Sequence, residues 1–334
     1  MIRTGRGIST IYYPSGFNGG GDPDLVSLRI KPDGTIDVSN ASCEMGQGLK
    51  NVVVQITAER LEIEPGQINF DNTNSDTAAF SMDTAGTRST VIVGNAILAA
   101  ADDLIGKLKA FVGEKLGVPA AEMSYEKGRT FITTQPEKGM TLAEIGAASN
   151  YGGVFLMGTG GYLPEPAPPR DPETGATLPS KIMAYGSCVA DVEVDDETGV
   201  VRVINLYNCY DMGTVINPLQ AEAQADGGNI QGIGMALFED LAPRFPERME
   251  PYADSFTDYI IPTFMDMPQH SATSFYENYD PNGPYGAKGC GEMVVDTQSP
   301  AIVNAIYDAV GVVVDSLPAT PEKVLRLIKE KKSK

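Results

Sequence analysis

Residues 25–39, LVSLRIKPDGTIDVS, alternate apolar and polar side chains on both sides of a Pro-Asp-Gly turn. This pattern predicts a β-hairpin, because successive side chains of a strand point to opposite faces and Pro-Asp-Gly favours a tight turn. Residues 189–207, VADVEVDDETGVVRVINLY, repeat the pattern around a turn at residues 196–199. Strands that come in hairpins, rather than alternating singly with helices, indicate an α+β fold rather than a doubly wound sheet.

Helices are predicted between and after the two hairpins. Apolar residues recur at helical spacing over residues 49–61 and 91–112. Three more helices are expected, each with an N-cap residue followed by a proline in its first turn. These pairs are Asn217 and Pro218, Ser299 and Pro300, and Thr320 and Pro321. The hairpin-then-helix order occurs on both sides of residues 158–179, a Gly- and Pro-rich segment that we interpret as a loop or linker. We therefore expect two α+β units, residues 1–170 and 171–334, with mixed sheets and packed helices.

Composition narrows the class of function. The chain has 334 residues, a formal net charge of −19 and one histidine, His270. So acidic a chain is a poor nucleic-acid binder, because phosphates require clusters of Lys and Arg. No apolar run reaches the ~18 residues that span a membrane, and the N-terminus lacks a secretory apolar segment, so we expect a cytoplasmic protein. The single histidine, which we place in a loop, excludes HExxH metalloproteases.

The four cysteines, Cys43, Cys188, Cys209 and Cys290, are not spaced as CxxC pairs. This chain alone therefore offers no set of cysteine ligands for zinc or an iron–sulfur cluster, and we expect reduced thiols. The sequence also lacks the GxxxxGK[ST] phosphate loop and the GxSxG nucleophile elbow. Phosphoryl transfer of the P-loop kind and α/β-hydrolase chemistry are not indicated.

The segment CEMGQGL, residues 43–49, joins a predicted strand to a predicted helix. Gly46 and Gly48 would let the backbone approach a ligand closely, and Gln47 between them can present an amide. The N-terminus of the helix that follows suits an anion. The alternative is a strand-to-helix turn with glycines for geometry, and spacing alone favours that alternative.

The segment DTAGTRST, residues 83–90, also precedes a helix. Thr87, Ser89 and Thr90 gather hydroxyl groups around Arg88, a combination typical of phosphate binding. Ordinary N-capping by Ser or Thr explains the same residues. From the residues alone, both interpretations stay open.

The segment QADGGNIQG, residues 224–232, lies within a predicted helix. Glycine inside a helix lowers its stability by roughly 1 kcal/mol relative to alanine. Such glycines indicate close packing against a backbone or a bulky ligand, and we favour helix packing. Gln224 and Gln231 are seven residues apart and are expected to share a helix face.

The segment GAKGCGE, residues 286–292, places Glu292 behind three glycines and just before a helix. A solvated loop glutamate is the usual role of this residue type. A further glycine-bearing segment in front of a helix nevertheless favours one shared site over several independent turns. Glu292 is the candidate catalytic residue of that site.

Taken in order, CEMGQGL, TAGTRST with VGNAI, INPLQAEAQADGGNIQGIGMALFED and GAKGCGE resemble the C-terminal molybdopterin-binding half of the molybdenum hydroxylases, the xanthine dehydrogenase and aldehyde oxidase family. The resemblance covers nearly the whole chain. The glycine-rich GGGFGG-type segment of the family's first half is absent. The chain thus resembles the smaller piece of a split molybdenum subunit, as in the medium molybdopterin subunits of bacterial nicotinate dehydrogenases.

The resemblance implies a role for each matched residue. Glu292 would be the general base in hydroxylating an N-heteroaromatic carbon with water as oxygen source, with nicotinate to 6-hydroxynicotinate as the expected reaction. A carboxylate near a metal site is a competent base for that chemistry. Molybdenum is expected near Gly86, Gln47 and Glu292, although no residue is assigned as its direct ligand. The expected cofactor-binding residues are Gly46, Gln47, Gly48, Ala85, Gly86, Thr87, Arg88, Ser89 and Gln224.

The resemblance also implies cofactors and partners. The cofactor would be molybdopterin in its cytosine dinucleotide form, with molybdenum carrying a terminal sulfido or selenido ligand. A larger molybdopterin subunit, an iron–sulfur subunit with [2Fe–2S] clusters and an FAD subunit would complete the enzyme. Alternatives are a purine, an aldehyde or another heterocycle as substrate, a non-catalytic scaffold that holds the cofactor, or an acidic binding domain without metal.

Two features qualify the match. Residues 291–294 read GEMV where many relatives have GEPP, so the path of the loop can differ. In TIYYPSGFN, residues 10–18, Tyr12 and Tyr13 could stack on or hydrogen-bond an aromatic substrate. Both could instead pack against the partner half. A chain that holds only one half of a cofactor site is also expected to have an open, apolar or glycine-rich side.

Overall fold

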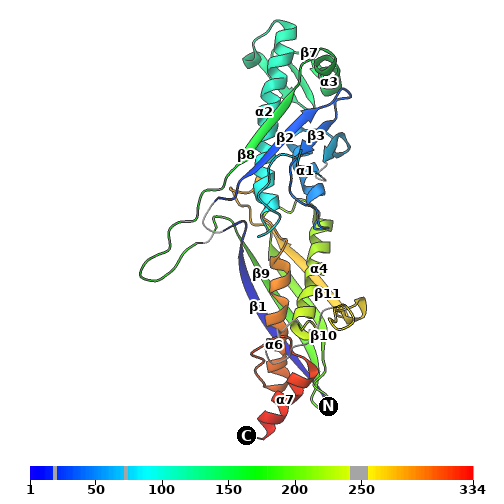
Figure 1. Ribbon diagram of the computed structural model, residues 1–334, viewed down its shortest axis with the longest axis vertical. Helices are drawn as coiled ribbons and strands as arrows, with labels where there is room; N and C mark the ends of the chain where they lie inside the picture. The colour runs from blue at the N-terminus through cyan, green and yellow to red at the C-terminus, as the bar shows by residue number, and fades with distance from the viewer. Residues whose placement is uncertain (18–20, 71–73, 179, 241–254, 334) are drawn as a thin grey trace.

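The computed structural model describes residues 1–17, 21–70, 74–178, 180–240 and 255–333. The molecule is elongated, with two α+β units arranged end to end along its long axis (Figure 1). We call the unit that contains β2 to β8 the upper unit and the unit that contains β1 and β9 to β11 the lower unit. The expected α+β class is confirmed.

The upper unit contains a four-stranded sheet in the order β4-β3-β2-β8 and a smaller sheet in the order β5-β6-β7. The strands are β2 (Asp24–Ile30), β3 (Ile36–Ser39), β4 (Ile68–Phe70), β5 (Met123–Glu126), β6 (Arg129–Ile132), β7 (Gln135–Thr141) and β8 (Met157–Tyr162). The helices are α1 (Leu49–Leu61), α2 (Ser89–Leu116) and α3 (Leu142–Tyr151). The antiparallel β2–β3 pair confirms the first predicted hairpin.

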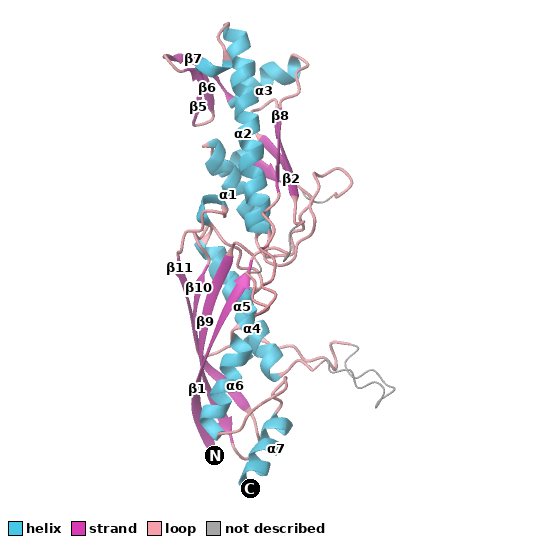
Figure 2. Cartoon of the chain, turned by 90° about the vertical axis from the view of Figure 1, so that its left-hand side faces the viewer, coloured by secondary structure: helices cyan, strands magenta, loops and turns pink. Residues whose placement is uncertain are grey.

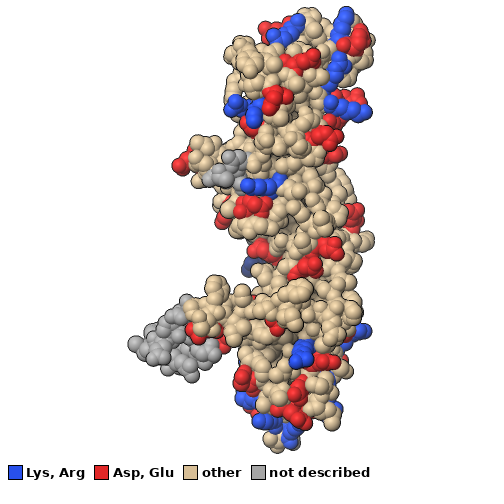
Figure 3. Space-filling model, turned by 90° about the vertical axis from the view of Figure 1, so that its right-hand side faces the viewer, with Lys and Arg blue, Asp and Glu red and all other residues tan. Residues whose placement is uncertain are grey.

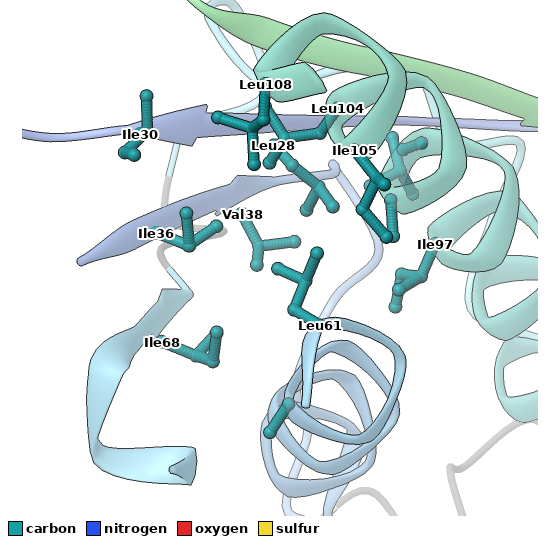
Figure 4. Close-up of a cluster of buried hydrophobic side chains, with 14 of the residues drawn as sticks. Leu28, Ile30, Ile36, Val38, Leu61, Ile68, Ile97, Leu104, Ile105 and Leu108 are labelled. Atoms are coloured by element: carbon teal, nitrogen blue, oxygen red, sulfur yellow. The ribbon is translucent and has the colours of Figure 1, made fainter. Parts of the chain in front are cut away.

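The core of the upper unit lies between the larger sheet, α1 and α2 (Figure 4). Inward-facing residues of β2 and β3 meet one face of α2, because the alternating strand pattern and the helical spacing each collect apolar side chains on one side. Each fully buried aliphatic side chain contributes roughly 1.5–3 kcal/mol. Labelled members of this cluster are Leu28, Ile30, Ile36, Val38, Leu61, Ile97, Leu104 and Leu108.

The predicted loop at residues 158–179 is wrong over its first residues, which belong to β8. A Cβ atom on Gly158 would lie 2.2 Å from the Ala100 carbonyl oxygen, and one on Gly160 would lie 2.2 Å from the Ala100 nitrogen. The glycines therefore let β8 lie directly against α2. Glycine density, which we took as a linker signal, here marks close packing of a strand on a helix.

The lower unit is built on one four-stranded sheet in the order β1-β9-β10-β11. Its strands are β1 (Ile2–Pro14), β9 (Met183–Asp195), β10 (Val201–Asp211) and β11 (His270–Tyr276). Its helices are α4 (Pro218–Leu237), α5 (Met293–Asp296), α6 (Gln298–Val310) and α7 (Pro321–Lys332). The antiparallel β9–β10 pair confirms the second hairpin, and β11 pairs with β10 in parallel, which makes the sheet mixed.

Helices α4, α5 and α6 cover one face of this sheet (Figure 2). Gly7 of β1 makes the contact with α6 possible, because a Cβ atom there would lie 2.1 Å from the Ala301 carbonyl oxygen. Strand β1 pairs with β9 along its whole length. The N-terminal strand thus lies in the lower unit, which differs from the expected division after residue 170; pairing between strands far apart in sequence leaves no local signal.

Three local predictions can be compared with the helix and strand ends. Asn217 and Thr320 are N-caps, as predicted, and their side chains accept hydrogen bonds from the third residue beyond. The cap predicted at Ser299 is wrong by two residues, because α6 begins at Gln298 after Thr297. His270 begins β11 instead of lying in a loop. Within the described residues, no helix is both long and apolar enough to cross a bilayer.

Candidate active site

A cleft of about 260 Å³ lies where the upper and lower units meet. We call it the junction cleft. All four segments singled out in the sequence contribute to its walls, although they are far apart along the chain. Residues from these segments that line it include Gln47, Ala85, Thr87, Arg88, Ser89, Gln224 and Glu292. The four segments therefore lie around one cleft.

Glu292 lies at the N-cap of α5, and Thr87 of the upper unit holds it in two ways. The Thr87 hydroxyl donates to Oε2 of Glu292 at 3.2 Å and accepts from the Glu292 backbone N–H at 3.1 Å. Thr87 has a left-handed φ of 56°, a strained conformation for a β-branched residue. Strain of this kind concentrates at functional sites.

Tyr13, near the end of β1, also binds Glu292. Its hydroxyl donates to Oε2 at 2.7 Å. Burial, followed by the hydrogen bond to the Glu292 carboxylate, raises the pKa of Tyr13 to about 12, so the phenol stays protonated and donates at neutral pH. Tyr12 points to the opposite face of β1 and is 67% exposed. Of the two tyrosines, only Tyr13 reaches the candidate base.

The glycines before Glu292 bring its loop against Thr87. A Cβ atom on Gly289 would lie 2.0 Å from the Thr87 carbonyl oxygen, so any larger residue there would push the loop away. On the other side, Gln224 Nε2 donates to the Gly291 carbonyl oxygen at 2.8 Å. Gln224 thus fixes the loop through its backbone and lines the cleft. Burial raises the pKa of the neighbouring Cys290 to about 11, so that thiol is not a ready nucleophile.

Lys288 anchors the same loop to the lower sheet. Its Nζ lies 2.7 Å from Asp211 Oδ2 and donates to the Met183 carbonyl oxygen at 3.0 Å. Both charged side chains are almost fully buried. The ammonium also lies 5.8 Å from the centre of the Tyr185 ring. Since a buried charge is stable only when it is paired, this ion pair fixes the position of the segment that ends in Glu292.

The contacts of Arg88 differ from its predicted role as a cofactor-binding residue. Its guanidinium is fully buried, lies 2.6 Å from Asp24 Oδ2, and also pairs with Asp22. It donates further to the carbonyl oxygens of Asp83, at 2.6 Å, and Pro23, at 3.2 Å. These acceptors occupy its donors. The contacts favour a role in tying the Thr87 segment to the residues that follow β1.

The segment CEMGQGL forms its own anion site. The Glu44 carboxylate accepts from the backbone N–H groups of Gly46 at 2.7 Å, Gly48 at 3.1 Å and Lys50 at 2.8 Å. Burial acts to raise the pKa of Glu44, but the three donors outweigh it and hold the pKa below its ordinary value. The anion predicted at the start of α1 is thus supplied by the chain itself.

Gln47 lines the junction cleft, with its amide bonded inside the same turn. Its Oε1 accepts from the Met45 N–H at 2.7 Å, and its Nε2 donates to the Cys43 carbonyl oxygen at 3.0 Å. The remaining glycines named in the sequence lie beside the cleft in left-handed backbone. They are Gly46 (φ 108°), Gly48 (φ 89°) and Gly86 (φ 57°), the last accepting from the Gly16 N–H at 2.8 Å.

The sequence analysis missed Gln220. It lies one helical turn before Gln224 on α4 and lines the junction cleft, whereas Gln231, which we paired with Gln224, is exposed. The i, i+4 spacing of the two glutamines was the available signal. The Gln220 Oε1 atom is buried and has no hydrogen-bond partner among the residues that the structure describes. Since such atoms are usually paired, a donor from a bound ligand or a water would satisfy it.

The junction cleft has a mixed wall, in which hydrogen-bonding groups lie among apolar side chains such as Met45, Leu49, Met212, Val215 and Ile216. The amide and hydroxyl side chains that line it are Gln47, Thr84, Thr87, Ser89, Thr90, Thr214, Asn217, Gln220 and Gln224. Its two basic residues, Arg88 and Lys288, are already paired with aspartates of this chain. A ligand rich in hydrogen-bonding groups, such as a pterin with a phosphate-bearing tail, fits this donor set and the orphaned oxygen of Gln220.

The junction cleft thus places a glutamate, fixed by two side-chain donors, between two α+β units. A sequence model described as "molybdopterin cofactor-binding domain" matches residues 1–268. The chain belongs to this family, the molybdopterin-binding domains of the molybdenum hydroxylases.

Individual relatives agree with that assignment. The chain is 30% identical over 305 residues to the 6-hydroxypseudooxynicotine dehydrogenase complex subunit gamma of Paenarthrobacter nicotinovorans, covering 89% of this chain and 36% of that protein. It is 31% identical over 310 residues to the nicotine 6-hydroxylase large subunit of the same organism, covering 92% and 37%. The crystal structure of quinoline 2-oxidoreductase from Pseudomonas putida 86 superposes with a TM-score of 0.81 at 27% identity, over 98% of this chain and 42% of that one. The chain thus spans well under half the length of the proteins it matches.

Proposed function

We propose that this chain is the molybdopterin-binding subunit that carries the general base of a molybdenum hydroxylase, and that the enzyme hydroxylates an N-heteroaromatic carbon with water as oxygen source. The observation that carries the proposal is the carboxylate of Glu292, held at the junction cleft by Tyr13 and Thr87. A scaffold that only holds a cofactor has no need of a carboxylate fixed by two side-chain donors.

The geometry gives each residue a task. When bound, the molybdenum cofactor supplies the two-electron oxidation and activates water. In the described part of the chain, both side-chain donors reach Oε2 of Glu292, which leaves Oε1 to accept a proton. Thr87 and the Lys288 anchor keep the carboxylate in place, and Gln224 fixes the loop before it. A base held in this way loses little orientational freedom when the reaction occurs.

The molybdopterin contacts are part of the same proposal. Gln47, Ala85, Ser89, Gln220 and Gln224 line the cleft and would hydrogen-bond the pterin and its tail. Glycines 46, 48 and 86 would let the backbone approach. We retain the cytosine dinucleotide form and a terminal sulfido or selenido ligand on molybdenum as predictions. Direct contact through the Arg88 side chain is not part of the proposal, since its donors are occupied.

The proposed substrate class is a nitrogen heterocycle, with nicotinate converted to 6-hydroxynicotinate as the reaction. Two relatives support this class by name, since nicotine 6-hydroxylase and quinoline 2-oxidoreductase act on N-heteroaromatic rings. Purines, aldehydes and other heterocycles are the competing substrates within the family. Activity of the purified enzyme on a panel of these compounds separates them.

The proposed enzyme contains more than this chain. A larger molybdopterin subunit would supply the rest of the cofactor site. An iron–sulfur subunit with [2Fe–2S] clusters and an FAD subunit would take the electrons away. We retain a cytoplasmic location as a prediction.

The test is metal analysis of the complex purified from its native host, with all co-purifying chains identified and the substrate panel assayed. We expect about one molybdenum per copy of this chain, a larger molybdopterin subunit, and turnover of nicotinate above that of purines and aldehydes. An active complex without molybdenum would overturn the proposed chemistry. Molybdenum together with turnover of a purine or an aldehyde alone would overturn only the substrate.

A further inference from the structure

We propose that the uncovered face of the lower sheet is the docking surface for the larger molybdopterin polypeptide. We call this surface the open face. It comprises Ile8, Thr10, Tyr12, Tyr185, Ser187, Val189, Tyr207, Cys209, Ala272, Ser274 and Tyr276. The inference rests on the proposed function, because that function requires a second polypeptide at the junction cleft.

The strand register makes the open face continuous. Val189 pairs with Ile8 on one side and with Tyr207 on the other, and Tyr207 pairs with Ala272. Two residues further along, a second row crosses the sheet in the same way: Thr10, Ser187, Cys209 and Ser274. A third row contains Tyr12, Tyr185, Asp211 and Tyr276. Since neighbouring strands lie about 4.8 Å apart, side chains of successive rows form one surface.

The open face carries large side chains that are exposed to solvent. The exposed fractions are 62% for Ile8, 67% for Tyr12, 52% for Tyr185, 42% for Tyr207 and 65% for Tyr276. Apart from Asp211, which is buried and paired with Lys288, no residue of the three rows is charged, in a chain of net charge −19. Elsewhere acidic and basic side chains are interspersed, as the side of the molecule in Figure 3 shows. Exposed aromatic residues without charges are typical of the centre of a protein interface.

Polar and charged groups lie at both ends of the open face. Near the N-terminal end of β1, Arg6 and Asp191 form a bidentate ion pair. The Arg6 nitrogens lie 2.6 Å from Oδ1 and 2.9 Å from Oδ2 of Asp191. At the other end, the buried Asp211 lies in the third row and is paired with Lys288. A polar rim around an apolar centre is the usual arrangement of an interface.

The chain itself does not cover this face in the described residues. Helices α4, α5 and α6 lie on the opposite side of the sheet, as Figure 2 shows. The alternation of burial along β9 agrees, because Cys188, Ala190 and Val192 are buried in the helix-side core while Tyr185 is exposed. An occupant of the open face would therefore have to come from outside the described residues.

Continuity with the junction cleft favours the larger molybdopterin polypeptide over a second copy of this chain. Lys288 lines the cleft, and its ammonium lies 5.8 Å from the ring of Tyr185 on the open face. A polypeptide that completes the cleft can thus extend directly onto the face. The proteins similar to this chain are also more than twice as long as the part that it matches, which leaves ample chain for such a contact.

Cys209, at the centre of the second row, provides a built-in reporter because its thiol is exposed in this chain. The native complex is treated with a maleimide, and labelling of Cys209 is followed by peptide mass spectrometry. The matched control is Tyr151→Cys in the same complex, since Tyr151 lies on the upper unit and is 85% exposed. We expect Cys209 to react at least about tenfold more slowly than the control, because the core of an interface is packed as tightly as a protein interior.

A photo-crosslinking amino acid at position 207 identifies the occupant. We expect crosslinked peptides from the larger molybdopterin polypeptide. Crosslinks to a second copy of this chain, to an iron–sulfur subunit or to a flavin subunit would overturn the proposal, as would labelling of Cys209 as fast as the control. Molybdenum is measured in the same preparation: if it is present while Cys209 reacts freely, docking fails and the proposed function stands.

Discussion

Replacing Tyr13 by phenylalanine removes one hydroxyl group beside the candidate base. That hydroxyl donates to Oε2 of Glu292 at 2.7 Å, whereas the Thr87 hydroxyl lies 3.2 Å from the same oxygen. Tyr13 therefore makes the shorter of the two bonds. A hydrogen bond to a charged group contributes roughly 1.5–3 kcal/mol. If that energy orients the base during proton transfer, Tyr13→Phe lowers kcat by about 10- to 150-fold.

The assay is steady-state hydroxylation across a range of pH, at equal molybdenum content. We expect kcat to fall while KM changes little, because the lost hydroxyl contacts the base. Tyr12→Phe is the matched control. It removes the same group from the next residue, which points to the opposite face of β1, and should leave turnover unchanged.

Two results would refute this reasoning. If kcat of Tyr13→Phe matches that of the unmodified enzyme, the hydrogen bond seen in the structure has no part in catalysis. If only KM rises, Tyr13 contacts the substrate, as the sequence-based hypothesis held, and does not position Glu292. A merely structural role would lower the unfolding midpoint and leave kcat per molybdenum unchanged.

Three predictions concern the elements that hold the site in place. Lys288→Met leaves the Asp211 carboxylate buried without its cation and should lower the free energy of unfolding by roughly 3–5 kcal/mol in chemical denaturation. Adding Asp211→Asn should recover most of that stability. A double variant as unstable as Lys288→Met would contradict the pairing. Glu44→Gln should lower the free energy of unfolding by roughly 1 kcal/mol at neutral pH. Folding holds the pKa of Glu44 below its unfolded value of about 4.3, so the stabilisation is present above that pH and is lost as the pH falls through the folded pKa. The difference in stability between Glu44→Gln and the unmodified chain should therefore vanish in acid. A difference that does not depend on pH would contradict this reasoning. Gly7→Ala places a methyl group against the Ala301 carbonyl oxygen and should destabilise by roughly 1–3 kcal/mol or more, whereas an unchanged midpoint would show that β1 can move away from α6.

Much of the architecture could be predicted because its signals are local. The Pro-Asp-Gly turn predicted the β2–β3 hairpin, and the apolar spacing of residues 49–61 predicted α1 to the residue. The caps at Asn217 and Thr320 are likewise properties of a few neighbouring residues. Local chemistry of this kind is present in the sequence before any tertiary contact forms.

Features that depend on distant contacts could not be predicted. Strand β1 joins the lower sheet through pairing with β9, more than 160 residues away. In the sequence, Gly158 and Gly160 resemble linker residues, but in the structure they pack directly against α2. Glycine has two uses, freedom in a loop and close approach in a packed core, and a sequence does not distinguish them.

In the candidate site, too, local features could be predicted and distant contacts could not. Its segments could be found, because glycines and hydroxyls in front of helices are visible in the sequence. The partners of each side chain could not. Glu44 fills the anion site of its own helix, Arg88 is taken up by two aspartates, and Gln220 lines the cleft where we had paired Gln224 with Gln231.

The most direct test of the central claim is the turnover of Glu292→Gln in the complete complex, with molybdenum measured in the same sample. The amide keeps the size of the side chain but cannot accept the proton. We predict a loss of turnover of about three orders of magnitude or more, with molybdenum content and subunit composition unchanged. Turnover near that of the unmodified complex, at equal molybdenum content, would contradict the assignment of Glu292 as the general base.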